Sequence, residues 1–266
     1  MKFLKMFGIG LICLLSSQVC AVTDAVLDGR AKKLPYDQGQ SVQQIVQNLT
    51  DGLDTDMEKA RVLASFVAFQ LDRNGYAERV LEKASQQNKP ADKMPTNDIL
   101  KTRIGTPQEY ATLYNQLCQA AGLSAVKIDG YAGQNIQSPD RKDPAGLQAV
   151  RHSMMQLTGL PDFRMQRYES SWNAIEIDGR WILVDTYRMI FGKRSVGKEI
   201  SSDKQMIRFL KQRERKGFHG NELSQGKRID EDYFDAKPQQ FVKTHYPLNP
   251  KWQLLPVPKT WQSFLR

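Results

Sequence analysis

The sequence has few cysteines and no long apolar run. Three cysteines among 266 residues are too few for a small scaffold held together by disulfides. No apolar stretch reaches the roughly 20 residues that span a bilayer, which excludes a multispan membrane protein. With 40% apolar and 25% charged residues, the composition also excludes a wholly disordered or collagen-like chain. These features are typical of a globular protein with a sizeable core.

Motifs for binding metals, nucleotides and nucleic acids are also absent. The sequence contains no C-x-x-C pair, no H-E-x-x-H motif, no calcium loop and no P-loop. We therefore expect no metal site and no cofactor. No motif that recognises nucleic acid accompanies the basic residues, so we expect no nucleic-acid partner.

The first 21 residues have the pattern of a secretory signal peptide. Lys2 and Lys5 give a basic start, ten apolar residues follow at 6–15, and small or polar residues then lead to Ala21. A short apolar stretch before a small-residue cleavage site is typical of a leader that is removed. We expect cleavage after Ala21 and an exported protein, either periplasmic or secreted. The alternative is a membrane anchor.

Cleavage at this position would remove two of the three cysteines. Cys13 and Cys20 belong to the leader, so the mature chain would keep Cys118 alone and could form no internal disulfide. Lipid attachment at Cys20 is the weaker alternative, because such sites favour a small residue before the cysteine and Val19 is branched.

The positive charge is concentrated in one segment. The whole chain has a formal net charge of +9, and residues 189–228 hold eleven Lys or Arg against four Asp or Glu. This basic insertion would suit an anionic surface. Its candidate contact residues are Lys193, Arg194, Arg208, Lys211, Arg213, Arg215 and Lys216. We favour the alternative, in which the insertion is a solvated segment with surplus lysines.

Helical patterns come first along the chain. Residues 22–40 are polar and indicate an N-terminal arm, and apolar spacing predicts helices at 41–49 and 56–71. A third helix is predicted from Thr106, because Thr106 and Glu109 form a T-x-x-E capping box and a proline follows Thr106 at the first helical position.

Strand patterns follow the helices. Residues 124–132 alternate as a strand, and residues 172–185 form two strand-like runs around the turn dipeptide Asp178-Gly179. Helices before strands predict an α+β fold, with N-terminal helices packed on an antiparallel sheet. A two-residue turn makes Trp172 face Asp185 and puts Ser170 on the same sheet face, in a diagonal position about 7–8 Å away.

The order of these elements resembles the transglutaminase-like superfamily, which has a papain-like fold. The resemblance rests on the helix after Gly105, the G-Y-A strand and W-N-A-I-E-I-D-G-R-W-I-L-V-D at 172–185. H-Y-P-L-N-P-K-W-Q-L-L at 245–255 resembles the end of the kyphoscoliosis-peptidase branch. The resemblance covers about residues 41–262, which we interpret as one transglutaminase-like domain containing the basic insertion.

The resemblance implies a Cys-His-Asp triad, of which this sequence keeps one member. The family's cysteine stands at a helix N-terminus, where the helix dipole lowers the pKa of a thiol. Pro107 occupies that position here, and Ser170 occupies the position of the histidine; only Asp185 is retained. A histidine ring could bridge the diagonal gap to Asp185, whereas a serine hydroxyl cannot. We expect Asp185 to bind a neighbouring backbone group or arginine instead.

We therefore expect a non-catalytic protein that binds a peptide, a protein or a cell-envelope polymer. Its vestigial cleft would use Thr106, Trp172 and Asn173. One alternative is an active peptidase or acyl transferase with a relocated nucleophile, for which the pair Ser170-Ser171 is the motive. The other is a basic adhesion module. Cys118 lies about 16 Å further along the helix than Pro107, so we interpret it as a buried filler.

The histidines are weak candidates for a catalytic base. We expect His245 to have a structural role. His152 and His219 lie in irregular segments, where we expect them to be exposed.

Overall fold

A computed structural model describes residues 22–34, 40–73, 99–100, 103–133, 169–191 and 227–264. The expected signal peptide at 1–21 lies outside these ranges. So do the seven basic residues named as candidate contacts, and so do His152 and His219. Within the described ranges, no helix is both long enough and apolar enough to cross a membrane.

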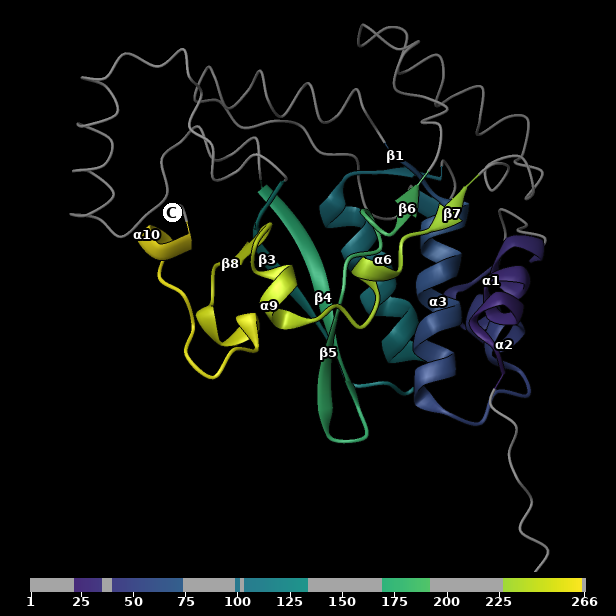
Figure 1. Ribbon diagram of the computed structural model, residues 1–266. Coiled ribbons are helices and arrows are strands. Elements are labelled where there is room, and N and C mark those ends of the chain that lie inside the picture. Colours follow the sequence, from purple (N-terminus) through teal and green to yellow (C-terminus); the bar gives the residue numbers. More distant parts are fainter. Residues whose placement is uncertain are drawn as a thin grey trace, which may run out of the picture.

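The helices predicted from sequence are confirmed, and they pack around a central one (Figure 1). The confirmed helices are α2 (Val42–Thr50), α3 (Asp56–Gln70) and α6 (Pro107–Ala120), and α1 (Asp24–Lys33), which was not predicted, packs with them. Capping boxes begin α2 at Ser41 and α3 at Thr55. Because α3 lies against α1, α2 and α6, its residues are buried on nearly every side.

The segment expected to be an N-terminal arm, residues 22–40, contains a helix, because residues 24–33 form α1. This helix is polar overall and buries two of its apolar side chains, Leu27 and Ala31, against α3. An ion pair completes the contact: Arg61 of α3 is buried and donates to Asp28 of α1 at 3.1 Å. Docking therefore depends on a charged partner more than 30 residues away, which the local sequence pattern does not reveal.

The main sheet has the antiparallel strand order β5-β4-β3-β8. These strands are β3 (Ala125–Ala132), β4 (Glu169–Ile177), β5 (Arg180–Val184) and β8 (His245–Pro247). The predicted hairpin is confirmed, with Asp178 and Gly179 at φ values of 51° and 73° between β4 and β5. Positive φ at both turn residues is the type I′ geometry that matches the twist of the paired strands.

Short elements complete the described fold. They are β1 (Asp72–Arg73), β2 (Ile104–Gly105), β6 (Ile190–Phe191), β7 (Arg228–Ile229), η2 (Glu231–Tyr233), α9 (Pro238–Phe241), η3 (Pro250–Gln253) and α10 (Trp261–Phe264).

The two faces of the sheet build separate apolar cores. Ile175 and Ile177 of β4 face the helices, whereas Trp172 and Ala174 face the C-terminal segment around Phe241. The period of two along β4 explains this division, since alternate side chains point to opposite faces. The α+β prediction, with helices on an antiparallel sheet, is confirmed.

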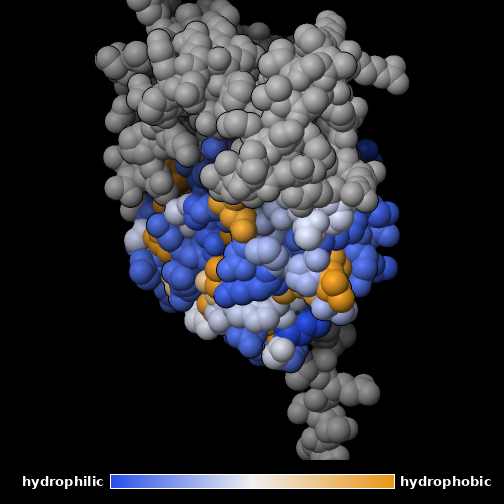
Figure 2. Space-filling view, turned by 90° about the vertical axis from the view of Figure 1, so that its left-hand side faces the viewer, coloured by the Kyte–Doolittle hydropathy of each residue, from blue (hydrophilic) through white to orange (hydrophobic). Residues whose placement is uncertain are grey.

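The face that carries α10 is mainly hydrophilic where it can be seen. Figure 2 shows small apolar patches there, separated by polar residues. Leu248 and Val257 are the large apolar side chains with the greatest exposure among the described residues. Single exposed apolar residues of this kind are normal on a protein surface.

Candidate functional site

The site begins at the N-terminus of α6. Pro107 is buried and is the first residue of this helix, where a missing N–H costs no hydrogen bond. The carboxylate of Glu109 folds back and accepts from the backbone N–H of Thr106 at 2.6 Å and from its hydroxyl at 3.0 Å. The helix start thus carries a buried carboxylate and no nucleophilic atom at position 107.

Asp185 lies directly after β5, and its carboxylate has four hydrogen-bond donors. Oδ1 accepts from the backbone N–H groups of Tyr187 and Arg188, each at 3.0 Å. Oδ2 accepts from Arg188 Nη1 and is 3.0 Å from His245 Nε2. Asp185 is fully buried, so these partners replace the water that it loses.

Arg188 bridges Asp185 to Ser170. Its Nη1 donates to the Ser170 hydroxyl and to Asp185 Oδ2, both at 3.0 Å, while Nη2 donates to the carbonyl of Ala132 at 2.8 Å. A guanidinium therefore spans the diagonal gap that a histidine ring would span in a triad. Because a guanidinium stays charged and has only donors, it cannot act as a base.

His245 approaches the same carboxylate from β8. Its ring stacks on Phe241 with centroids 3.7 Å apart, and Nδ1 lies 2.8 Å from the Thr244 hydroxyl. Both ring nitrogens are therefore occupied, and the side chain is buried. This position agrees with the structural role expected from the sequence.

The charges of this cluster set its protonation. Burial alone would raise the pKa of Asp185, but the charge of Arg188 and the hydrogen bond from His245 outweigh it and hold that pKa at about 2. Burial lowers the pKa of His245, although Asp185 opposes this effect. At neutral pH the cluster is an ionised carboxylate, a guanidinium and a neutral imidazole.

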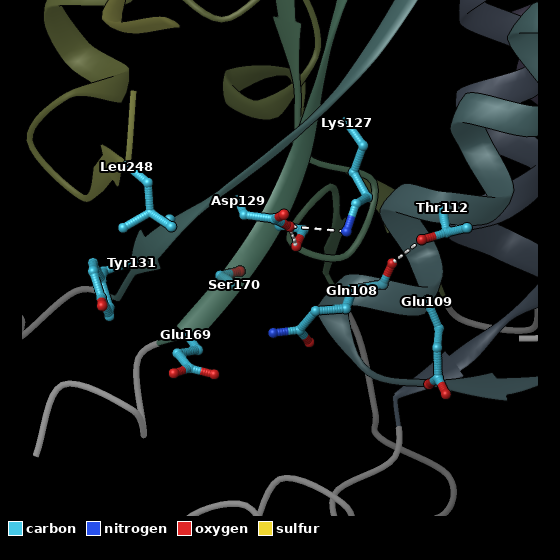
Figure 3. A pocket seen from close by; sticks show the side chains of 11 residues that line it. Gln108, Glu109, Thr112, Lys127, Asp129, Tyr131, Glu169, Ser170 and Leu248 are labelled. Carbon is cyan, nitrogen blue, oxygen red and sulfur yellow. Dashed lines mark hydrogen bonds and ion pairs between the residues drawn. The ribbon is translucent and has the colours of Figure 1, made fainter. Parts of the chain in front are cut away.

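A cleft of about 440 Å³ lies beside this cluster (Figure 3). We call it the α6 cleft. It is formed by Gln108, Glu109, Thr112, Lys127, Asp129, Gly130, Tyr131, Glu169, Ser170, Ser171 and Leu248. The first turn of α6 forms one wall and the strands β3 and β4 form the other, with Ser170 on β4. Its volume is within the range of small-ligand sites.

The polar groups of the α6 cleft are partly paired. Asp129 Oδ1 accepts from Lys127 Nζ at 2.9 Å and from the Ser171 hydroxyl at 2.6 Å. Glu169 is exposed at the end of β4 and has no hydrogen bond or ion pair to other described residues. The described part of the wall therefore offers carboxylates, hydroxyl groups and one lysine.

The three residues expected to contact a ligand are not in this cleft. Thr106, Trp172 and Asn173 are each 1% exposed or less. Asn173 donates to the carbonyl of Ala111 on α6, and Trp172 packs against the rings of Phe241 and His245. The positions of Trp172 and Asn173 reflect packing of the strand and that of Thr106 reflects capping of α6, while the expectation that these residues bind a ligand stays a prediction.

Cys118 is buried within α6 and close to Tyr114. Burial raises the pKa of its thiol to about 12, although a hydrogen bond with Tyr114 lowers it in part. A thiol that remains protonated and enclosed is unreactive. Among the described residues, no three His, Cys, Asp or Glu side chains are grouped to hold a metal ion.

Arg188 is the site residue that sequence reasoning missed. It lies three residues after Asp185 in a turn, and the motif used for the resemblance ends at Asp185. An arginine shortly after a buried carboxylate is a weak signal by itself, since the chain has 38 Lys and Arg residues. Arg188 reaches the site because the turn after Asp185 directs its side chain towards Ser170.

Comparison with known proteins identifies relatives over most of the chain. The family model described as transglutaminase-like superfamily matches residues 43–186. Kyphoscoliosis peptidase from Mus musculus is 25% identical over 239 residues, which cover 90% of this chain and 28% of that protein. Hillarin from Drosophila melanogaster is 25% identical over 220 residues, which cover 83% of this chain and 21% of that protein.

Two solved structures also align with part of the fold. A proposed protease from Parabacteroides distasonis covers 60% of this chain with a TM-score of 0.32 and 18% identity, and the match spans 25% of that protein. A proposed cysteine protease from Cytophaga hutchinsonii covers 62% with a TM-score of 0.35 and 15% identity, spanning 43% of that protein. The chain spans less than a third of the length of the two relatives described above. The expected fold family and branch are confirmed by the family match and these relatives.

Proposed function

This chain belongs to the transglutaminase-like superfamily, and we propose that it is an exported, non-catalytic member that binds a peptide, a protein or an envelope polymer in the α6 cleft. The observation that carries this proposal is the contact of Arg188 with both Ser170 and Asp185. The guanidinium is bonded to both Ser170 and Asp185, which stand at the positions of the histidine and the aspartate of the family's triad. Pro107, at the position of the cysteine, supplies no nucleophile.

One observation favours the alternative of an active enzyme with a relocated nucleophile. Ser171 forms part of the cleft wall and donates to Asp129 at 2.6 Å. A carboxylate is a weak base for a serine hydroxyl, and Asp129 also accepts from Lys127. His245, the described imidazole closest to the site, is buried and bonded through both nitrogens.

Turnover experiments separate these readings. The mature protein is incubated with casein, amine donors and thiol-reactive probes, beside Cys118→Ala and Ser171→Ala. We expect all three proteins to give only the background of buffer. Turnover that either substitution abolishes would overturn the non-catalytic assignment and name its nucleophile.

The charge of the α6 cleft favours a basic ligand. Among the described lining residues, the exposed Glu169 contributes a carboxylate with no hydrogen bond or ion pair to another described residue, and Lys127 is already bonded to Asp129. A volume of about 440 Å³ accommodates a few side chains of an extended segment, whether that segment belongs to a peptide, a protein or a polymer. We therefore infer that the ligand presents a lysine, an arginine or an amino group to this wall.

A binding experiment tests the ligand's charge. Basic, neutral and acidic peptides of equal length are titrated into the labelled protein at two salt concentrations. We expect the basic peptide to bind most tightly, and Glu169→Gln to weaken it about five-fold, as an exposed ion pair contributes up to about 1 kcal/mol. Glu176→Gln is the matched control, because Glu176 is exposed on the same strand outside the cleft. Equal binding of all three peptides would contradict the inference.

The adhesion reading depends on the basic insertion, which lies outside the described residues. It predicts binding to anionic vesicles that weakens steeply as salt rises. Salt-independent binding, or no binding, would exclude it.

A further inference from the structure

The backbone N–H of Val22 donates a hydrogen bond to a buried carboxylate. The nitrogen is 2.7 Å from Oε1 of Glu58, a side chain on the first turn of α3 that is only 6% exposed. Val22 itself is partly buried against the core formed by the helices. Val22 is also the residue that would follow the expected leader cleavage after Ala21.

We propose that removal of the leader between Ala21 and Val22 creates an α-ammonium group that forms an ion pair with Glu58 and fastens α1 to the core. The reaction is a hydrolysis by the host's signal peptidase. Water adds a hydroxyl to the carbonyl of Ala21 and a hydrogen to the nitrogen of Val22, which takes up a further proton at neutral pH. This inference is independent of the proposed ligand and of the absence of catalysis.

The carboxylate of Glu58 has a separate oxygen for this partner. Oε2 accepts from the backbone N–H and the hydroxyl of Thr55, which completes the capping box of α3. Oε1 accepts from Val22. These hydrogen bonds, first the one from Val22, lower the pKa of Glu58, so the carboxylate is ionised at neutral pH. Cleavage would replace a neutral donor with a charged one at the same oxygen, and such bonds are about twice as strong.

Electrostatics explain why a carboxylate is needed there. A free ammonium group two residues before Asp24 would face the positive end of the α1 dipole, which is unfavourable. Glu58 offsets this repulsion from the neighbouring helix. The nearby cation on α3, Arg61, is already bonded to Asp28 and Glu231, and Lys59 pairs with Asp56.

The first experiment identifies the processed terminus. The full chain is expressed with its own leader in a secreting bacterial host, and the exported protein is analysed by N-terminal sequencing and intact mass. We expect Val22 as the first residue. A retained leader, a different first residue, or a lipid-modified Cys20 would overturn the inference.

The second experiment measures the ion pair. The mature protein is released from a fusion so that Val22 comes first, and it is compared with a version that carries one extra glycine before Val22. We expect the extra residue to lower Tm by about 2–4 °C near pH 7. The pKa of the ammonium group is raised by its partner, so the difference should persist below about pH 8 and disappear as pH rises through that raised value.

Substitution of Glu58 provides the control. Glu58→Gln keeps a residue that completes a capping box but removes the charge, so it should abolish the effect of the extra glycine. Glu176→Gln, at an exposed position of β4, should leave that effect intact. If Glu58→Gln does not fold, acylation of the α-amine at pH 8 replaces it: the Val22 terminus should react several-fold more slowly than the extended one. Equal Tm values and equal acylation rates would contradict the ion pair.

Discussion

At Asp185, one carboxylate accepts from two backbone N–H groups and Arg188 and is hydrogen-bonded to His245. The cluster joins three parts of the chain: the turn after β5, β4 through Ser170, and β8. A buried carboxylate without a countercharge is costly, so each partner stabilises the fold as well as limiting the chemistry of the site.

Replacement of Arg188 tests this stabilisation. Arg188→Ala leaves Asp185 buried beside a neutral imidazole, and we expect the free energy of unfolding to fall by about 3 kcal/mol. Arg188→Lys retains the charge but cannot reach Ser170 and Ala132 together, so its loss should be smaller. Urea unfolding measures both. A loss below about 0.5 kcal/mol for Arg188→Ala would show that the guanidinium has no structural role.

The pH dependence of stability follows from the same cluster. The pKa of His245 is lowered by burial, and that of Asp185 is held at about 2 despite burial. Both native groups therefore bind fewer protons than in the unfolded chain. We expect stability to fall as pH drops below about 6.5, where unfolded histidine is protonated, and again from about pH 4 towards pH 2.

The variant His245→Gln tests whether His245 causes the first of these two declines in stability. His245→Gln retains a side-chain donor for Asp185 but does not titrate, so the decline between about pH 6.5 and pH 5 should be reduced. Denaturant midpoints of both proteins across this range provide the measurement. An unchanged decline in the variant would attribute it to other groups.

At the scale of elements, α1 shows how docking decides helix formation. It has few apolar residues, and its contacts with α3 are made by Leu27, Ala31 and the ion pair of Asp28 with Arg61. The helices with local signals were predictable: Ser41, Thr55 and Thr106 begin α2, α3 and α6 at capping boxes, and an Asp-Gly turn joins β4 to β5.

Two glycine substitutions test whether α1 is helical. A Cβ at Gly29, within α1, would meet no atom within 4 Å. Gly29→Ala should therefore raise the free energy of unfolding by about 0.5–1 kcal/mol, because alanine loses less backbone entropy in a helix.

Gly52 is the matched control for Gly29. It has equally open surroundings but a φ of +67°, which alanine tolerates poorly, so Gly52→Ala should lower stability. Thermal unfolding measures both variants. A destabilising Gly29→Ala would contradict the helix and restore the flexible arm.

At the scale of the whole molecule, two apolar cores hold the sheet between the helices and the C-terminal segment. The α6 cleft lies where the first turn of α6 meets β3 and β4 (Figure 3). This arrangement was predictable from the order of elements and from the family motifs. The hairpin register even placed Ser170 diagonal to Asp185.

The contents of the site were less predictable than its location. The sequence pattern could not distinguish Trp172 and Asn173, which the strand turns into the protein, from Ser171 and Asp129, which form the cleft wall. Asn173 and Ser171 share one face of β4, so that distinction depends on how far along the strand α6 covers it. The arginine that bridges Ser170 and Asp185 depends in turn on the conformation of residues 185–188, which is set by contacts formed only after folding.

The most direct test of the non-catalytic assignment is the intact mass of the mature protein after incubation with reactive acyl donors. A working nucleophile would retain an acyl group, and the mass would rise by that group. With Pro107 at the start of α6 and Arg188 bonded to Ser170 and Asp185, we predict an unchanged mass. A stoichiometric increase that maps to Ser171 or Cys118, and that disappears when this residue becomes alanine, would contradict the account.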